Sequence, residues 1–429
     1  MIYNCVLVRF SGEFGVKSLQ TQNYMETLLR SNIKSGLNAS GNEELLKRLN
    51  IISRQGRYYL ALKQPTDKEI EALISIVGRS FGVSSVSPCF QTSVKDPMTI
   101  KTIPAKLMLA YEIYPSKIEI KILDKKSGID EKKWKDYINN LCEKFSQGKD
   151  SKVSILRFHS AKNWDMGPWM YCREKKLEIE VFENNAYITA EKIKSPGGFP
   201  LGLEDPLVAL ISGGIDSPVA AWMAMKRGAP LIMVIMDSTE GSARPPPKGA
   251  SVKEKALMEA KILLEYMKGY PSPKIFIVPY GKALNELAKA GSYEGITCLL
   301  CKRFMYKVAE NIAQIYGAKG IITGEILGEQ ASQTAQNLMV LNEITKIPVH
   351  RPLFGFDKIE VIDKAKHIGT DKLFSLSQEP CWAVPEHPEV RGSIETIRKA
   401  EKNAKTDELI KYCLDNIKQV SVKEIEKMP

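Results

Sequence analysis

Short apolar runs alternate with helical segments through the second half of this 429-residue chain. The apolar runs are strand-sized, and helical segments separate them. Alternation of this kind predicts a parallel sheet covered by helices on both faces, in which ligands bind at the carboxyl ends of the strands. The expected elements are, in order, Leu207–Ile211, Ser217–Arg227, Leu231–Met236, Val252–Met267, Ile275–Val278, Cys298–Tyr316 and Gly320–Thr323.

A glycine-rich turn connects the first of these strands to its helix. Two glycines allow tight turning and close backbone approach to a phosphate, and two serine hydroxyls add donors. The helix that follows directs unpaired N–H groups and a partial positive charge at the same place. The turn therefore predicts a phosphate-binding loop, different from the Gly-Lys-Ser/Thr loop of the commoner ATPases, which the chain lacks. The residues expected to bind nucleotide are Ser212, Gly213, Gly214, Asp216 and Ser217.

This Ser-Gly-Gly-x-Asp-Ser pattern resembles the signature of the PP-loop ATP pyrophosphatases, which cleave ATP to AMP and pyrophosphate while they adenylate an acceptor. The resemblance implies that Asp216 assists Mg²⁺ and pyrophosphate. A carboxylate close to phosphates also needs a cation between them on chemical grounds. In this fold the end of the second strand usually holds adenine, which makes Met236 a candidate. An ordinary core residue at a strand end is the alternative.

The first half of the chain is the more basic one. Residues 1–200 carry 31 basic and 22 acidic residues, whereas residues 201–429 carry 30 and 28, for a net charge of +11. A basic half suits a polyanion such as a nucleic acid, and a merely basic surface is the alternative. No apolar run approaches the ~20 residues of a membrane helix. Arg9 interrupts the apolar N-terminus, so we expect a cytoplasmic protein without a membrane partner.

The local patterns of the first half predict a small α+β unit ending near Pro88, followed by further strands, one helix and a hairpin. Ser195–Gly202 reads as a Gly/Pro-rich linker, and Ile394–Lys427 as a charged helical tail. The expected strands are residues 2–9, Ile51–Leu62, Ile118–Leu123, Val153–Phe158, Leu177–Phe182 and Ala186–Ala190, and the expected helices are Leu19–Leu37, Asp67–Val77 and Trp134–Phe145.

Five further segments resemble motifs of one family, the tRNA 4-thiouridine synthetases (ThiI). They are Leu7–Glu13, Gly197–Pro200, Thr323–Thr334, Arg351-Pro352-Leu353 with Asp357-Lys358, and Glu379-Pro380-Cys381. The resemblance implies an α/β protein with a C-terminal PP-loop sheet (adenine nucleotide alpha hydrolase-like) and N-terminal α+β domains. The implied domains are 1–90 (ferredoxin-like), 91–195 (THUMP, RNA-binding), 196–395 (PP-loop) and 396–429 (helical tail).

The same resemblance implies a tRNA uracil 4-sulfurtransferase that adenylates uridine 8 of tRNA with ATP and replaces its oxygen by sulfur. Lys358 stands at the position of a lysine important in the family and could steady developing phosphate charge. A solvated lysine at a helix start is the alternative. Gly324 and Gln333 are expected near the nucleotide. Gln330, Ser332 and Thr334 could orient a base or ATP, or serve as helix caps or surface polar groups.

Expected partners are tRNA and either sulfide or a sulfur donor protein, with a homodimer as one option for assembly. Two other functions stay open at this stage. One is a PP-loop enzyme that activates another tRNA base or a small molecule. The other is a non-catalytic THUMP RNA-binding protein. The basic first half argues against a small-molecule enzyme, and the intact loop argues against a retired ATP site.

The eight cysteines do not suggest a disulfide framework in a chain of this length. Cys381 aligns with the family's catalytic cysteine, and no rhodanese domain follows it here. Cys298 and Cys301 are three residues apart, a spacing that can chelate a soft metal. With Cys381 as a third ligand, they predict an iron–sulfur cluster with one open iron. A Zn²⁺ site, a redox dithiol and a structural pair are the alternatives.

Overall fold

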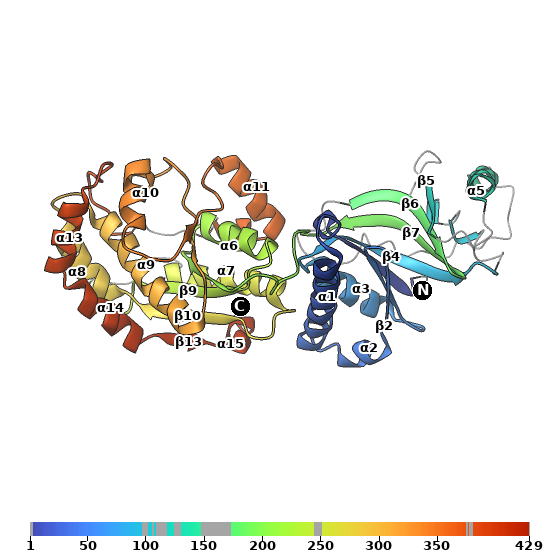
Figure 1. Cartoon of the computed structure of the whole chain (residues 1–429), viewed down its shortest axis with the longest axis horizontal. Coiled ribbons are helices and arrows are strands. Elements are labelled where there is room, and N and C mark those ends of the chain that lie inside the picture. Colours follow the sequence, from blue (N-terminus) through green and yellow to red (C-terminus); the bar gives the residue numbers. More distant parts are fainter. Residues whose placement is uncertain are drawn as a thin grey trace. The chain divides into compact units, whose positions relative to one another are not determined.

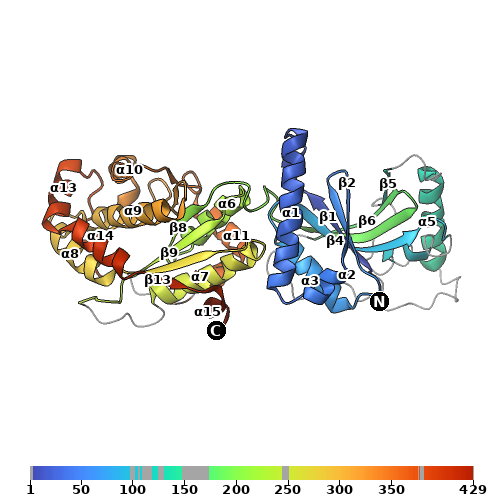
Figure 2. The ribbon, with the colours of Figure 1, turned by 60° about the horizontal axis from the view of Figure 1, so that its bottom comes forward.

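The computed structural model describes residues 3–96, 102–104, 107–108, 118–123, 130–146, 173–243, 251–374, 376 and 381–428. The chain divides into two compact units, Met1–Pro200 and Leu201–Pro429 (Figures 1 and 2). The division falls inside the Gly/Pro-rich segment 195–202. Among the described helices, none is both long and apolar enough to cross a bilayer.

One mixed sheet organises the first unit. Its described strands lie in the order β2-β3-β1-β4-β7-β6-β5. Only β5 and β6 pair in parallel among the described ladders of this sheet. The strands are β1 (Cys5–Phe10), β2 (Asn50–Arg54), β3 (Arg57–Ala61), β4 (Val83–Ser93), β5 (Ile118–Ile122), β6 (Arg173–Phe182) and β7 (Asn185–Lys194).

One expectation for this unit needs correction. The segment Ile51–Leu62 is a hairpin rather than one strand, because Gln55 and Gly56 both adopt positive φ, 42° and 74°, as a two-residue turn of the I′ kind requires. Strand β4 passes Pro88 and continues to Ser93, and it pairs with β1 on one side and β7 on the other. The expected strand Val153–Phe158 lies outside the described residues.

The three predicted helices of the first unit are present, and a short fourth helix, Glu43–Arg48, was not predicted. Helix α3 begins with a capping box in which Thr66 and Glu69 satisfy each other's backbone N–H groups. It packs against α1 and against the strands β1 and β4 (Figure 2). The helices are α1 (Leu19–Ala39), α2 (Glu43–Arg48), α3 (Asp67–Gly78) and α5 (Glu131–Ser146).

The second unit contains the predicted parallel sheet. Its described strands lie in the order β12-β11-β8-β9-β10-β13, and all pair in parallel except β13. They are β8 (Leu207–Ile211), β9 (Leu231–Asp237), β10 (Lys274–Pro279), β11 (Ile321–Ile322), β12 (Val349–His350) and β13 (Lys418–Val420). The central strands β8 and β9 are almost wholly buried, which explains their continuous apolar runs.

Helices cover both faces of this sheet (Figure 1). One group, α8, α9, α13 and α14, shares a core with β9 and β10, whereas α6, α7 and α11 pack against one another. Capping boxes begin α7 and α11, and left-handed glycines end α9 and α11. The bounds are α6 (Asp216–Lys226), α7 (Val252–Met267), α8 (Gly281–Gly291), α9 (Thr297–Tyr316), α10 (Ala335–Asn342), α11 (Lys358–Ile368), α12 (Asp371–Phe374), α13 (Ile394–Asn403), α14 (Thr406–Asp415) and α15 (Val422–Glu426).

The C-terminal tail is not wholly helical, contrary to expectation. Strand β13 interrupts it between α14 and α15 and pairs antiparallel with β10. Its three residues are polar or half-buried, so they give no apolar signal of their own. The strand forms because β10 would otherwise leave an unpaired edge.

Candidate active site

The predicted phosphate loop connects β8 to α6, as the sequence pattern indicates. The backbone N–H of Ser212 donates to the Ser217 hydroxyl oxygen at 3.0 Å, and the two hydroxyl oxygens are also 3.0 Å apart. Gly213 has a φ of 72°, which a residue with a side chain rarely adopts. The loop is therefore closed on itself, with both serine hydroxyls at the amino end of α6.

Helix α7 packs against this loop. A methyl group at Gly213 would lie 2.9 Å from the Val252 carbonyl oxygen and 3.1 Å from Cβ of Lys255. The N–H of Gly213 donates to the carboxyl group of Glu259 at 3.1 Å. Burial raises the pKa of Glu259 to about 8. Glu259 was not among the predicted site residues, although a glutamate on the buried face of α7, beside Ala256 and Ala260, is a signal that could have revealed it.

Gly324 lies against the start of α6. An added Cβ there would be 2.8 Å from both the Asp216 carbonyl carbon and the Ser217 nitrogen. Only a residue without a side chain allows this approach, because the obstructing atoms belong to the backbone. The structure therefore brings Gly324, predicted from a motif more than a hundred residues downstream, next to the phosphate loop.

Lys358 reaches the same place from the first turn of α11. Its Nζ lies 2.8 Å from a carboxylate oxygen of Asp216 and 2.8 Å from one of Glu329. Burial raises the pKa of Asp216 despite the adjacent ammonium group. Burial alone would lower the pKa of Lys358, but its hydrogen bonds to the two carboxylates outweigh that effect and the pKa is raised. Lys358 is thus a fixed cation beside the loop, although it is also the first residue of its helix.

The remaining nucleotide candidates have local contacts. The Gln333 side-chain oxygen accepts the Ile326 N–H at 3.2 Å, which holds the motif loop in shape. Thr334 is the N-cap of α10, in line with the capping alternative. Met236 is buried near the carboxyl end of β9, opposite Val278 of β10.

Three cysteines lie near one another at the carboxyl edge of the sheet. Cys298 and Cys301 occupy the first turn of α9 and are partly buried, whereas Cys381 is exposed. Burial raises the pKa of Cys301 to about 12, although a hydrogen bond from Tyr280 opposes the rise, and negative charge on Cys298 and Cys381 adds to it. In the described residues, no three His, Cys, Asp or Glu side chains stand close enough together to hold a metal ion.

The other cysteines that the structure describes behave as small hydrophobic residues, as expected. Cys5, Cys89 and Cys413 are buried. The side chains of Cys142 and Cys172 lie outside the described part of the chain.

Glu325 joins two of the predicted motifs. Its buried carboxylate receives Arg351 Nε at 2.7 Å, Lys302 Nζ at 3.0 Å and the Tyr306 hydroxyl at 2.6 Å. Burial opposes ionisation, but the two cations outweigh it and lower the pKa of Glu325. The carboxylate therefore stays charged and ties strand β11 to β12 and α9.

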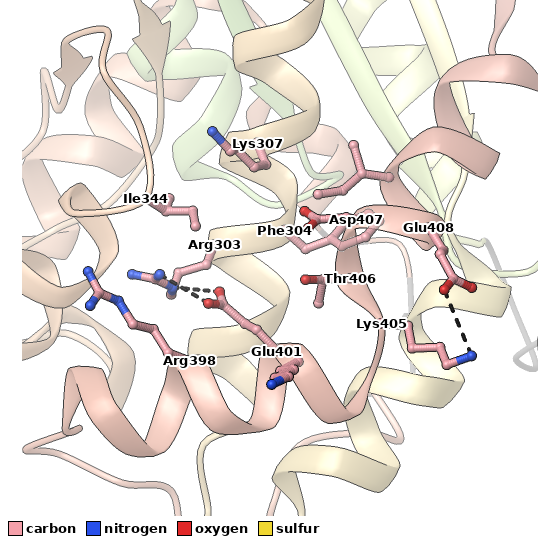
Figure 3. A pocket seen from close by; sticks show the side chains of 12 residues that line it. Arg303, Phe304, Lys307, Ile344, Arg398, Glu401, Lys405, Thr406, Asp407 and Glu408 are labelled. Carbon is pink, nitrogen blue, oxygen red and sulfur yellow. Dashed lines mark hydrogen bonds and ion pairs between the residues drawn. The ribbon is translucent and has the colours of Figure 1, made fainter.

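A cavity of about 410 Å³ lies between α9, α13 and the start of α14 (Figure 3). The guanidinium of Arg303 lies at this cavity and donates to both carboxylate oxygens of Glu401, at 2.7 and 3.2 Å. It also donates to Glu343 and to the Val340 carbonyl oxygen. None of the predicted site residues lines the cavity, and its buried cation is already paired.

Comparison with known proteins gives consistent matches. Residues 202–406 match the family model described as thiamine biosynthesis protein (ThiI), and residues 5–87 match the ThiI ferredoxin-like domain. A probable tRNA sulfurtransferase from Thermococcus kodakarensis is 32% identical over 93% of this chain and 96% of its own length. One from Methanobrevibacter smithii is 31% identical over 97% of this chain and its own full length.

A solved structure gives the same result for the fold. The crystal structure of a 4-thiouridine synthetase in complex with RNA and bound ATP matches with a TM-score of 0.74 and 25% identity. The match covers 98% of this chain and all of the other. The expected ferredoxin-like and PP-loop parts are thereby confirmed.

Proposed function

This chain belongs to the ThiI family, in which the two relatives compared above are named probable tRNA sulfurtransferases, and on that premise we propose how its residues use ATP to thiolate tRNA. The observation that supports this activity is that residues from three motifs, far apart in the sequence, lie together. Lys358 forms a hydrogen bond with Asp216 of the phosphate loop, and Gly324 packs on Asp216 and Ser217. Because the site is intact, a non-catalytic RNA-binding protein is disfavoured. Similarity to tRNA sulfurtransferases over nearly the whole chain disfavours an enzyme that acts on a small molecule.

In the first step, the loop and the amino end of α6 bind the phosphates of ATP. The uridine O4 forms a bond to the α-phosphorus, the bond to the bridging oxygen breaks, and pyrophosphate leaves with its electron pair. Lys358 stabilises the charge that develops there, because a preorganised cation favours the transition state. Asp216 would hold Mg²⁺, whose charge would offset that of the phosphates. The Asp216 carboxylate fits that role because it already pairs with a cation, the ammonium group of Lys358.

In the second step, sulfur forms a bond to C4 of the base, the C–O bond breaks, AMP leaves and the proton on sulfur is released. We assign delivery to Cys298, Cys301 and Cys381, with sulfide or a donor protein as the source. Three thiol sulfurs suit a soft metal such as the iron of a cluster. In the described residues the thiols are neighbours but not a ready metal group, so a cluster requires the exposed Cys381 to join the other two.

The substrate position and the domain division rest on family resemblance. We propose uridine 8 as the base that is thiolated. We also propose 1–90, 91–195, 196–395 and 396–429 as the functional divisions, although β4 joins strands of both N-terminal parts in one sheet. A homodimer stays a prediction.

The deciding experiment uses the purified chain, prepared without oxygen, with an unmodified tRNA transcript, ATP, Mg²⁺ and sulfide. Mass spectrometry of the digested tRNA should detect 4-thiouridine only when ATP is present. A transcript with cytidine at position 8 should stay unmodified and should release no pyrophosphate. Modification of that control transcript would contradict the proposed position, and absence of 4-thiouridine from every transcript would contradict the activity.

Iron analysis of the same protein separates the sulfur-site alternatives. A cluster predicts brown protein with iron and acid-labile sulfide, whereas Zn²⁺ or a dithiol predicts colourless protein. Full thiolation by iron-free protein supplied with sulfide would exclude the cluster and leave chemistry at Cys381 itself.

A further inference from the structure

A buried carboxyl group lies directly beneath the phosphate loop. Glu259 is only 2% exposed and projects from the middle of α7. Its Oε2 accepts the N–H of Gly213, 3.1 Å away. Burying a carboxyl group costs folding free energy unless the group is hydrogen-bonded. The hydrogen bond from Gly213 is therefore the reason that a carboxyl group can occupy this buried position.

The loop packs closely on α7 beside Glu259. Gly213 packs so closely on Val252 and Lys255 that there is no space for a methyl group. The Ser217 hydroxyl, at the other end of the loop, accepts the N–H of Ser212. The loop is therefore closed by its own serines and is held to α7 through the hydrogen bond from Gly213 to Glu259.

Few charges act on Glu259. Lys255, one turn earlier on α7 and 3% exposed, is the cation in its surroundings, and Asp216 of α6 is the anion. Lys255 directs its ammonium group to the carbonyl oxygen of Leu376, at 3.4 Å, rather than to Glu259. Burial outweighs the attraction of Lys255, so the carboxyl group remains easy to protonate.

We propose that Glu259 is a positioning residue of the ATP site, which fixes the phosphate loop to α7 through the Gly213 N–H. The inference rests on the proposed function, because it assumes that this loop binds the phosphates of ATP.

Protonation changes what the carboxyl group can do. A neutral Glu259 accepts the N–H of Gly213 and adds no charge to the loop. An ionised Glu259 still accepts that N–H but adds a negative charge next to the phosphates. ATP should therefore bind best below the pKa of this group and progressively more weakly above it.

Three full-length variants test this. Glu259→Gln keeps an acceptor and a donor but cannot ionise, and Glu259→Ala removes both. Glu310→Gln is the matched control, because Glu310 is equally buried at 2% and accepts the N–H of Lys346 at 2.7 Å, outside the ATP site. The measurements are binding of a non-hydrolysable ATP analogue without tRNA, and KM and kcat for pyrophosphate release with tRNA, from pH 7 to 9.5.

For the wild-type chain and Glu310→Gln, we expect the dissociation constant of the analogue to rise above pH 8, by up to about tenfold per pH unit, as loss of a single proton allows. Glu259→Gln should show no such rise. Glu259→Ala should raise KM about tenfold at pH 7, the effect of one lost hydrogen bond to the loop, with a smaller change in kcat.

A rise with pH in Glu259→Gln equal to that of the wild type would overturn the inference, and so would an unchanged KM in Glu259→Ala. If Glu259→Ala does not fold, the pH profile of Glu259→Gln still decides. The analogue assay contains no tRNA, so failure of tRNA thiolation leaves the result on Glu259 intact. An analogue that does not bind to the wild type contradicts both proposals.

Discussion

Replacing Gly324 by alanine should damage the ATP site through a single methyl group. That methyl would lie 2.8 Å from backbone atoms of Asp216 and Ser217, whereas carbon atoms in contact are comfortable at about 3.5–4.0 Å. Gly324, just after β11, and the start of α6 must therefore separate by roughly 0.7–1.2 Å. Gly324 has no positive φ to complicate the substitution, so the whole effect comes from this contact.

The magnitude follows from the displacement. Overpacking of this kind costs about 1–3 kcal/mol of folding free energy, which should lower the unfolding midpoint of this unit by about 2–12 °C. Misplacement of a reacting group by about 1 Å can reduce the rate about a hundredfold. We expect a loss of that order in kcat/KM for ATP, measured as tRNA-dependent pyrophosphate release and accompanied by a thermal scan of the full chain.

Gly355→Ala is the matched control. A methyl at Gly355 would meet no atom of the described chain within 4 Å, and its φ is not positive. This variant should retain wild-type kinetics and thermal stability. Wild-type activity in Gly324→Ala, or equal losses in both variants, would refute the argument that close packing against α6 shapes the site.

Three further predictions follow from the contacts of the second unit. Lys358→Met should lower kcat for pyrophosphate release by about 10²–10³-fold, as for loss of a transition-state donor, while equilibrium binding of tRNA stays within threefold. Arg351→Met should destabilise the unit by about 3–5 kcal/mol in urea unfolding, because it leaves the buried Glu325 carboxylate with one cation fewer; a change below 1 kcal/mol would contradict this. Cys301→Ala should abolish thiolation and iron content but retain pyrophosphate release, whereas Cys413→Ala should retain all three.

Local chemistry explains why much of the second unit could be predicted. The predicted bounds of α7 agree with the structure because Ser251 and Glu254 form a capping box at its start. Helix α9 ends at Tyr316 because Gly317 adopts the left-handed conformation there. The phosphate loop was equally predictable, since every feature of it lies within six consecutive residues.

Features that depend on distant contacts could not be predicted from local pattern. The turn at Gln55-Gly56 lies inside an otherwise continuous strand signal, and the non-glycine residue there adopts positive φ only because both flanking strands pair. Strand β13 has no apolar pattern and exists because β10 offers an edge. Glu259 is a charged residue within a helix, and only the fold reveals that the loop lies over it.

The segment after β11 connects the phosphate loop to helix α9. Gly324, the second residue after the strand, packs on the phosphate loop, and the next residue, Glu325, forms an ion pair with Lys302. Lys302 directly follows Cys301 on α9, so the regions proposed for adenylation and for sulfur delivery are connected through two adjacent residues of one chain segment. A shift of that segment would move both regions together. The motif that contains Gly324 and Glu325 therefore links the phosphate loop to the cysteines of α9.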